Sequence, residues 1–343
     1  MAYIALARKY RPGTFNDFVG QEAIAKTLTN AISADKVSHA YLFCGSRGTG
    51  KTSMARVFAM ALNCKTGPTI TPCGECDVCR DIQAGSDLDV QELDGASNRG
   101  IDQVRALREN VRFVPNRARY RIYYIDEAHM LTIEAFNALL KTLEEPPSHV
   151  KFILASTAPS RIPDTIHSRC QRFDFRRISA GDVARRLQVV CSAEKLAVPD
   201  DVLQFIGRRV RGSMRDGLSL LDQVGSFAQG DLTVGTVEAM LGGVAQERLD
   251  AILDDLLNGN VPGALGAASK LLDSGCDAPD ILEQLAANAR MLLIASQCGA
   301  QADLLERAMP EAEKLVERSK AFSPDYLIYV IQTLYEADRK SVV

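Results

Sequence analysis

At 343 residues, the chain is longer than a single hydrophobic core usually grows, so two or three domains are expected. Its 46% hydrophobic content suits ordinary globular cores, and its net charge of −3, from 40 basic and 43 acidic residues, excludes a globally basic nucleic-acid-binding protein. The longest apolar runs fall far short of a membrane span, and the N-terminus lacks a signal-peptide core, so we expect a cytoplasmic protein with no membrane partner.

Short apolar runs alternate with segments of helical periodicity up to about residue 178. The runs that read as strands are 41–44, 90–93, 122–125 and 151–155. This alternation is typical of a parallel α/β sheet.

After the extended run 172–175, the chain reads as helix to its end. Candidate N-cap residues that open these helices are Ser179, Ser213, Thr233 and Ser323. A double glycine at 242–243 marks a second boundary. We therefore predict an α/β core at 1–178, a small helical lid at 179–242 and an all-helical domain at 243–343.

A phosphate-binding loop follows the first strand. Residues 45–52 read G-x-x-x-x-G-K-T, and a segment of helical period comes next. In such a loop, backbone N–H groups surround the phosphates, Lys51 places a positive charge between them, and the Thr52 hydroxyl can ligate Mg²⁺. The helix N-terminus beyond the loop also favours anions. The predicted nucleotide-binding residues here are Gly45, Gly48, Gly50, Lys51, Thr52 and Ser53.

Two carboxylates follow the apolar strand 121–125. Asp126 lies at the carboxyl end of this strand, and in a parallel sheet that end lies beside the phosphate loop. We predict that Asp126 holds Mg²⁺ through water and that Glu127 polarises the attacking water. The alternative is an acidic helix start after a strand.

Three further residues are candidates for the same chemistry. Thr157 ends the strand 151–155 and could sense the γ-phosphate or orient the water, although a helix N-cap is the competing interpretation. Arg169 stands in Ser168-Arg169-Cys170, where a surface ion pair is the alternative. Arg215 opens a helix of the second domain and could reach back onto the phosphates.

Four cysteines are spaced Cys64-x8-Cys73-x2-Cys76-x2-Cys79. Thiolates at this spacing can close a tetrahedral shell around Zn²⁺, and four protein ligands leave no position for water. We therefore predict a structural zinc module at 64–79, with a redox role for the last two cysteines as the alternative.

A possible nucleic-acid contact is the helical segment after residue 100. Ile101, Val104, Leu107 and Val111 form its apolar stripe, and arginines at 105, 108 and 112 fall on an adjoining face. Such a row could follow a DNA backbone without reading bases, but a solvated or ion-paired face explains it equally well. If this face contacts DNA, as the family resemblance given below implies, the candidate residues are Asn98, Arg99 and Arg105.

Together these motifs resemble the AAA+ ATPases and, more closely, the gamma/tau family of clamp-loader subunits of bacterial DNA polymerase III. The resemblance covers essentially the whole chain. The stretches that carry it are 7–12, 18–22, the phosphate loop, Cys64 to Cys79, Asp126-Glu127, 137–147 and 168–170.

The resemblance implies roles for individual residues. Arg11 and Val19 would lie near the base and phosphates of ATP, and Thr157 would be the sensor of the core domain. Arg215 would be the sensor of the lid. Arg169 would act in trans, as an arginine finger that enters the active site of a neighbouring subunit.

The resemblance also implies a function and partners. The chain would be the ATP-hydrolysing motor that opens the sliding clamp and loads it onto primer–template DNA, which it grips by the backbone. Its C-terminal helices would form a collar in a hetero-pentamer with delta, delta-prime and further gamma/tau copies. The weaker alternatives are another AAA+ DNA-remodelling motor and a non-hydrolysing scaffold stabilised by ATP and zinc.

Overall fold

The computed structural model describes residues 3–97, 100–227, 232–240, 246–273, 276–300 and 309–341. The chain divides into two compact units, Met1–Leu232 and Thr233–Val343. The described helices include none that is both long and apolar enough to cross a membrane.

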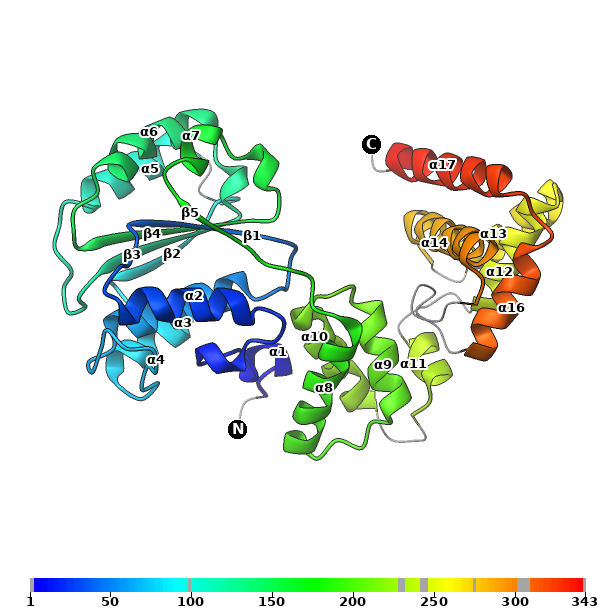
Figure 1. Ribbon diagram of the computed structural model, residues 1–343, viewed down its shortest axis with the longest axis horizontal. Helices are drawn as coiled ribbons and strands as arrows, with labels where there is room; N and C mark the ends of the chain where they lie inside the picture. The colour runs from blue at the N-terminus through cyan, green and yellow to red at the C-terminus, as the bar shows by residue number, and fades with distance from the viewer. Residues whose placement is uncertain are drawn as a thin grey trace. The chain divides into compact units, whose positions relative to one another are not determined.

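A five-stranded parallel sheet forms the centre of the first unit (Figure 1). Its bounds are β1 Ala40–Cys44, β2 Val90–Asp94, β3 Arg121–Asp126, β4 Val150–Ser156 and β5 Gln171–Asp174, in the spatial order β2-β3-β4-β1-β5. The predicted parallel sheet is confirmed. β1 and β4 are buried along their whole length, which explains their unbroken apolar runs. The register sets Asp94 of β2 beside Asp126 of β3 at the carboxyl edge.

Helices cover both faces of this sheet (Figure 1). The helices of this unit that precede β5 are α1 Leu6–Lys9, η1 Phe15–Asp17, α2 Glu22–Ser33, α3 Lys51–Asn63, α4 Asp77–Ala84, α5 Ile101–Asn110, η2 Ala128–Met130, α6 Ile133–Glu144, η3 Pro159–Arg161 and α7 Asp164–His167. Side chains of α2, α3 and α4 pack on one face around Tyr41, and those of α5, α6 and α7 pack on the other around Leu42. Adjacent strand residues therefore serve two separate cores, as the alternation of a β-strand requires.

Three helices form the lid that ends the first unit: α8 Ala180–Glu194, α9 Asp200–Arg209 and α10 Met214–Phe227. Ser179 caps α8, because its Oγ accepts a hydrogen bond from the Asp182 N–H at 3.1 Å. Ser213 caps α10 in the same way through the Asp216 N–H at 3.3 Å. Both predicted caps are confirmed.

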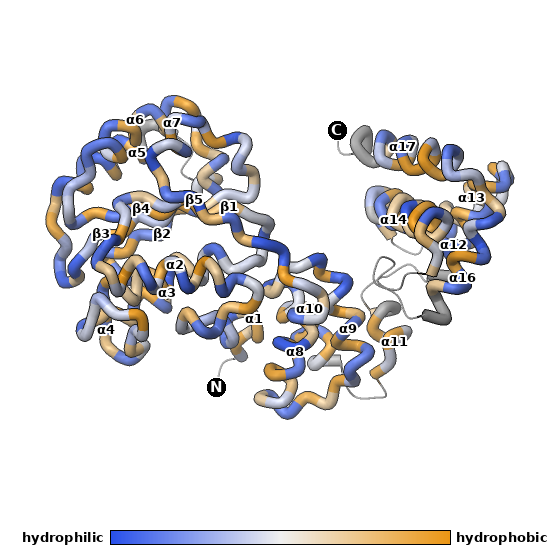
Figure 2. Tube along the Cα trace, viewed as in Figure 1, coloured by the Kyte–Doolittle hydropathy of each residue, from blue (hydrophilic) through white to orange (hydrophobic). Residues whose placement is uncertain are grey.

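The second unit is all helical. Its bounds are α11 Val234–Met240, α12 Gln246–Leu257, α13 Val261–Asp273, α14 Ala278–Cys298, α16 Met309–Ser319 and α17 Pro324–Ser341. Thr233 and Ser323 cap α11 and α17, as predicted. Apolar residues recur among polar ones along α17 (Figure 2). Two of its apolar residues, Leu327 and Leu334, are buried in the hydrophobic core of this unit. The unit begins at Thr233, whereas the sequence placed the boundary at 243.

Candidate nucleotide-binding site

The phosphate loop joins β1 to α3 and is folded around its own lysine. Lys51 is only 6% exposed, and its Nζ donates hydrogen bonds to the carbonyl oxygens of Gly45 at 2.7 Å and Ser46 at 2.8 Å. Burial lowers the pKa of Lys51. Gly50 adopts a left-handed φ of 103° just before α3, a conformation that favours glycine. The loop thus delivers a buried ammonium group to the start of a helix, as phosphate binding requires.

Asp126 lies against the first turn of α3. Its Oδ2 accepts a hydrogen bond from the Thr52 hydroxyl at 3.1 Å, and the Tyr124 hydroxyl donates to Thr52 Oγ1 at 3.0 Å. Mg²⁺ prefers oxygen ligands and usually keeps several waters. The neighbouring Thr52 and Asp126 oxygens therefore fit one magnesium ion that Thr52 would ligate directly and Asp126 would hold through water.

Glu127 is held by the neighbouring strand. Its Oε2 accepts hydrogen bonds from the Thr157 hydroxyl at 2.8 Å and the Thr157 N–H at 3.3 Å. His129 Nδ1 lies 3.3 Å from the same oxygen and 3.2 Å from Ser156 Oγ. The backbone of Glu127 has a φ of 44°, a conformation that is uncommon outside glycine and that clusters at functional sites. The core thus determines where this carboxylate points.

A cavity of about 520 Å³ opens over these groups. The predicted residues that line it are Arg11, Gly48, Gly50, Lys51, Thr52, Ser53, Asp126, Glu127 and Arg215. Within the described chain, the predicted residues that do not line it are Val19, Gly45, Thr157 and Arg169. Gly45 still contributes its carbonyl to Lys51, and Thr157 contributes through Glu127.

Arg11 reaches the cavity from the N-terminal segment. Burial lowers the pKa of Arg11, and the nearby guanidinium groups of Arg56 and Arg215 lower it further. The nearby Glu92 carboxylate acts in the opposite direction. The cavity is lined both by cations and by the carboxylates of Asp94, Asp126 and Glu127. Such a mixed lining suits a phosphorylated ligand that carries a metal ion, because the cations can meet phosphate oxygens and the carboxylates can meet the metal.

The lining residues that the sequence did not single out individually are Ala7, Tyr10, Pro12, Arg47, Asp94, Met214 and Leu218. Ala7, Tyr10 and Pro12 lie in the stretch 7–12 that carries the family resemblance, and Arg47 lies in the phosphate loop. Asp94 ends the strand next to β3, so the rule that parallel strands share a carboxyl edge could have placed it beside Asp126. Met214 and Leu218 reach the cavity through tertiary packing.

Arg169 forms contacts within its own chain. Its Nε donates to Glu144 Oε1 at 3.1 Å, and its Nη1 donates to the Thr165 carbonyl oxygen at 2.8 Å. The side chain is 31% exposed. The isolated chain therefore shows the ion pair that the sequence left as the alternative, and a role in trans stays a prediction.

The predicted DNA-contacting residues are only partly visible. Asn98 and Arg99 lie outside the described residues. Arg105 is exposed on α5, while Val104, Leu107 and Val111 are buried, as the predicted stripe requires. The position of Arg105 is compatible with a contact but does not test it.

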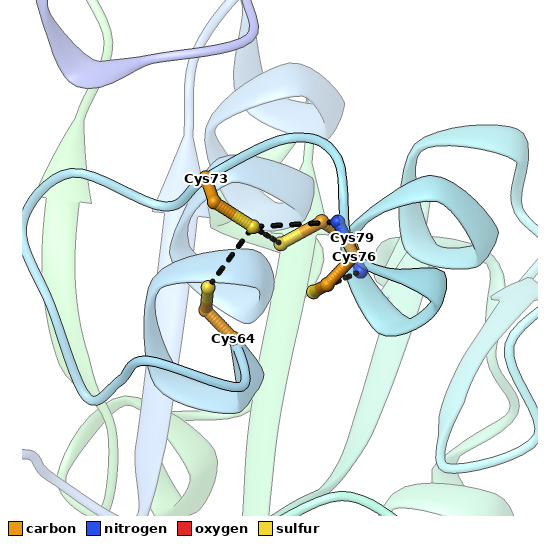
Figure 3. Close-up of side chains that lie close together, drawn as sticks. All are labelled: Cys64, Cys73, Cys76 and Cys79. Carbon is orange, nitrogen blue, oxygen red and sulfur yellow. Dashed lines mark hydrogen bonds between the residues drawn. The ribbon is translucent and has the colours of Figure 1, made fainter.

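The four clustered cysteines lie between α3 and α4 with their sulfur atoms together (Figure 3). All four Sγ atoms lie within 4.8 Å of one another, with Cys64 and Cys73 3.5 Å apart and Cys73 and Cys79 3.9 Å apart. Tetrahedral thiolates around Zn²⁺ are ~3.8 Å apart. Burial raises the pKa of Cys64, but hydrogen bonds from Cys73 and Thr66 outweigh it and bring the value to about 6. The donor set fits a closed zinc site.

The sheet order, the phosphate loop and the lid define a protein with the AAA+ fold. A Thermotoga maritima RuvB Holliday junction branch migration motor has a TM-score of 0.52 and 17% identity, covering 72% of this chain and 79% of that one, which shows the fold alone.

Family models match consecutive parts of the chain: "DNA polymerase III, delta subunit" at 20–179, "DNA polymerase III clamp loader subunit, ATPase lid domain" at 182–230 and "DNA polymerase III subunits gamma and tau domain III" at 232–340. The chain is 44% identical over 340 residues to DNA polymerase III subunit tau of Bacillus subtilis, covering 99% of this chain and 60% of that one. It is 37% identical to subunit gamma of Buchnera aphidicola, covering 83% of this chain and 77% of that one. The chain therefore belongs to the family of DNA polymerase III gamma and tau subunits.

Proposed function

We propose that this chain is an ATP-hydrolysing motor subunit of a replicative clamp loader, which opens the sliding clamp and loads it onto primer–template DNA. The main observation behind the proposal is that the predicted phosphate-binding, metal-binding and catalytic residues lie together around one cavity. Lys51, the Thr52–Asp126 pair and Glu127 meet in one cavity that Arg215 of the lid also lines. The chain spans 60% of the length of the Bacillus subtilis relative.

In this proposal, different residues of the chain bind the phosphates, hold the metal ion and activate the attacking water. The loop amides and Lys51 bind the β- and γ-phosphates, while Arg11 and Arg215 approach from the N-terminal segment and the lid. Thr52 and Asp126 hold Mg²⁺, which neutralises charge that develops on the phosphate oxygens. Glu127 polarises the attacking water. Thr157 sets the orientation of that carboxylate by donating to its Oε2.

Arg169 completes the active site of a neighbouring subunit in this proposal. Its absence from the lining of its own chain's cavity, within the described residues, supports a role in trans. Its contacts with Glu144 and the Thr165 carbonyl oxygen then have to be exchanged on assembly. An active site completed this way requires an oligomer, and we propose the hetero-pentamer with delta, delta-prime and further gamma/tau copies.

ATP binding favours an assembly with high affinity for clamp and DNA, and hydrolysis loosens the subunit interfaces. This is a population shift, because the phosphate contacts of Arg215 and Arg169 exist in one state only. DNA is gripped by its backbone through Asn98, Arg99 and Arg105. The four cysteines hold a structural zinc ion, and the protein works in the cytoplasm.

The test is ATPase activity of the purified chain alone and then with clamp, primed DNA and the other loader subunits. Lys51→Ala should abolish nucleotide binding, and Glu127→Gln should keep binding but slow hydrolysis by roughly 10²–10⁴-fold. Arg169→Ala should keep nucleotide binding on its own chain and lower the rate of the assembly by about 10³-fold or more.

Activity that requires the whole set of components and falls steeply with salt supports both partner and DNA assignments. The scaffold interpretation wins if Lys51→Ala and Glu127→Gln both leave single-turnover phosphate release unchanged while assembly persists.

A further inference from the structure

We propose that the N-terminal segment 3–10 acts as part of the lid, and that Glu194 and Asp222 are positioning residues that hold this segment over the nucleotide cavity. The inference rests on the proposed function, because it concerns how the same cavity binds ATP. Neither carboxylate lines the cavity within the described residues, so both act through the segment that they hold.

The segment is tied to two lid helices by side-chain contacts. Asp222, on α10, accepts hydrogen bonds from the Tyr3 hydroxyl and, at 3.2 Å, from the Leu6 N–H. Glu194, the last residue of α8, accepts a hydrogen bond from the Tyr10 hydroxyl and pairs with Lys9 Nζ at 2.5 Å. The contacts of Lys9 and Tyr10 lower the pKa of Glu194. Two carboxylates thus anchor both ends of α1 to the lid.

The chain beyond Pro12 belongs to the core instead. Asp17 Oδ2 accepts hydrogen bonds from the N–H groups of Gly13 at 3.1 Å and Thr14 at 2.8 Å. Phe15 and Phe18 are buried in the core beside α2 and α3. The change of anchor falls at residues 11–13, where a side chain added at Gly13 would meet nothing within 4 Å. Gly13 therefore has room to act as the pivot between lid and core.

The segment and the lid line the same cavity. Tyr10, Arg11 and the flanking residues of the segment belong to its lining, and so do Arg215 and its neighbours on α10. A lid that moves relative to the core carries Tyr10 with it, because Tyr10 is bonded to α8. Nucleotide contacts of the segment and of Arg215 are therefore made and broken together, and loosening either anchor weakens ATP binding.

The experiment is a titration of the full chain with a fluorescent ATP analogue, followed by the ATPase rate in the reconstituted assembly. Asp222→Asn and Glu194→Gln should each raise the dissociation constant about fivefold, since each weakens charge-assisted hydrogen bonds. The kcat at saturating ATP should stay within about twofold of wild type, because the catalytic groups lie on the core and the neighbour. Purely structural damage would lower kcat as well.

Asp182→Asn is the matched control, because Asp182 is also an ion-paired carboxylate of α8 but pairs with Arg185 of its own helix. Its dissociation constant should equal that of wild type. Tyr10→Phe removes only the hydroxyl that bonds Glu194, and its effect should not add to that of Glu194→Gln. This second variant carries the test if Glu194→Gln fails to fold.

Variants at 194 and 222 that bind the analogue like wild type, or an equal loss in Asp182→Asn, would overturn the inference. A wild-type chain that binds no analogue would instead overturn the proposed function, so the two failures are distinguishable.

Discussion

Replacing Gly48 by alanine should break the contact between the phosphate loop and the lid. Gly48 has a φ of 76°, and a Cβ added there would lie 1.9 Å from Ser213 Oγ and 2.9 Å from Ser213 Cβ. The Gly48 carbonyl oxygen also accepts a hydrogen bond from the Met214 N–H at 3.1 Å. The loop and the first residue of α10 are therefore packed backbone against backbone.

The cost has two parts. A positive φ in a residue with a Cβ costs about 1–2 kcal/mol, and overpacking a tight contact costs a further ~1–3 kcal/mol. We expect Gly48→Ala to lower the free energy of unfolding of the first unit by roughly 2–5 kcal/mol and to weaken ATP binding, because the clash pushes Arg215 away from the phosphates.

The variant Gly20→Ala separates the backbone cost of a positive φ from the cost of overpacking. Gly20 has a φ of 73°, but its nearest neighbour to an added Cβ is Ile178 Cγ1 at 3.6 Å, an ordinary contact. This control should show the backbone cost alone. Ser213→Gly removes both clashing atoms and, because glycine is a tolerated N-cap, costs only a few tenths of a kcal/mol, about 0.3, by itself. The double variant should recover about 1–3 kcal/mol.

Urea denaturation followed by circular dichroism measures these differences. The transition of the first unit is the one that ATP shifts to higher urea concentration. The reasoning is refuted if Gly48→Ala and Gly20→Ala are equally destabilised, or if Ser213→Gly rescues nothing.

Two further predictions concern the cysteine module and the loop before β3. We expect metal analysis to find one zinc ion per chain in wild type and none in Cys64→Ser, which should also destabilise the first unit by about 3 kcal/mol or more; zinc retained by the variant would contradict the four-thiolate site. Asp89 is fully buried and accepts hydrogen bonds from the N–H groups of Asn116, Arg117 and Ala118, which outweigh burial and lower its pKa. A depressed folded pKa means that this stabilisation is present above the unfolded value of about 3.9 and is lost as pH falls through the folded value. Asp89→Asn should therefore lower the free energy of unfolding at pH 7 by about 2–4 kcal/mol and flatten its acid dependence, as urea titrations at pH 7 and pH 3 would show; an unchanged acid dependence would contradict this.

Local signals predicted the framework of the first unit. The five strands, the phosphate loop and the caps at Ser179 and Ser213 depend on residues close together in the chain, where spacing and side-chain type suffice. The cysteine cluster was predictable for the same reason, because Cys73, Cys76 and Cys79 share one turn and helix start.

Local patterns could not assign the arginines. Arg169 pairs with Glu144, which is 25 residues away, and the same motif is equally compatible with an ion pair and with a trans-acting finger. Only the contacts of an assembled complex distinguish these, because the chemistry of a guanidinium is the same in both.

By itself, the sequence predicted which residues could bind phosphate, magnesium and zinc, since those abilities belong to side chains and to short backbone turns. Only the tertiary structure decided which residues orient these groups. It brings Thr157 and His129 onto the Glu127 carboxylate, and it joins Tyr10 to Glu194 across 184 positions. Contacts between residues so far apart in the sequence produce no periodic sequence pattern, because they depend on how whole helices and strands pack.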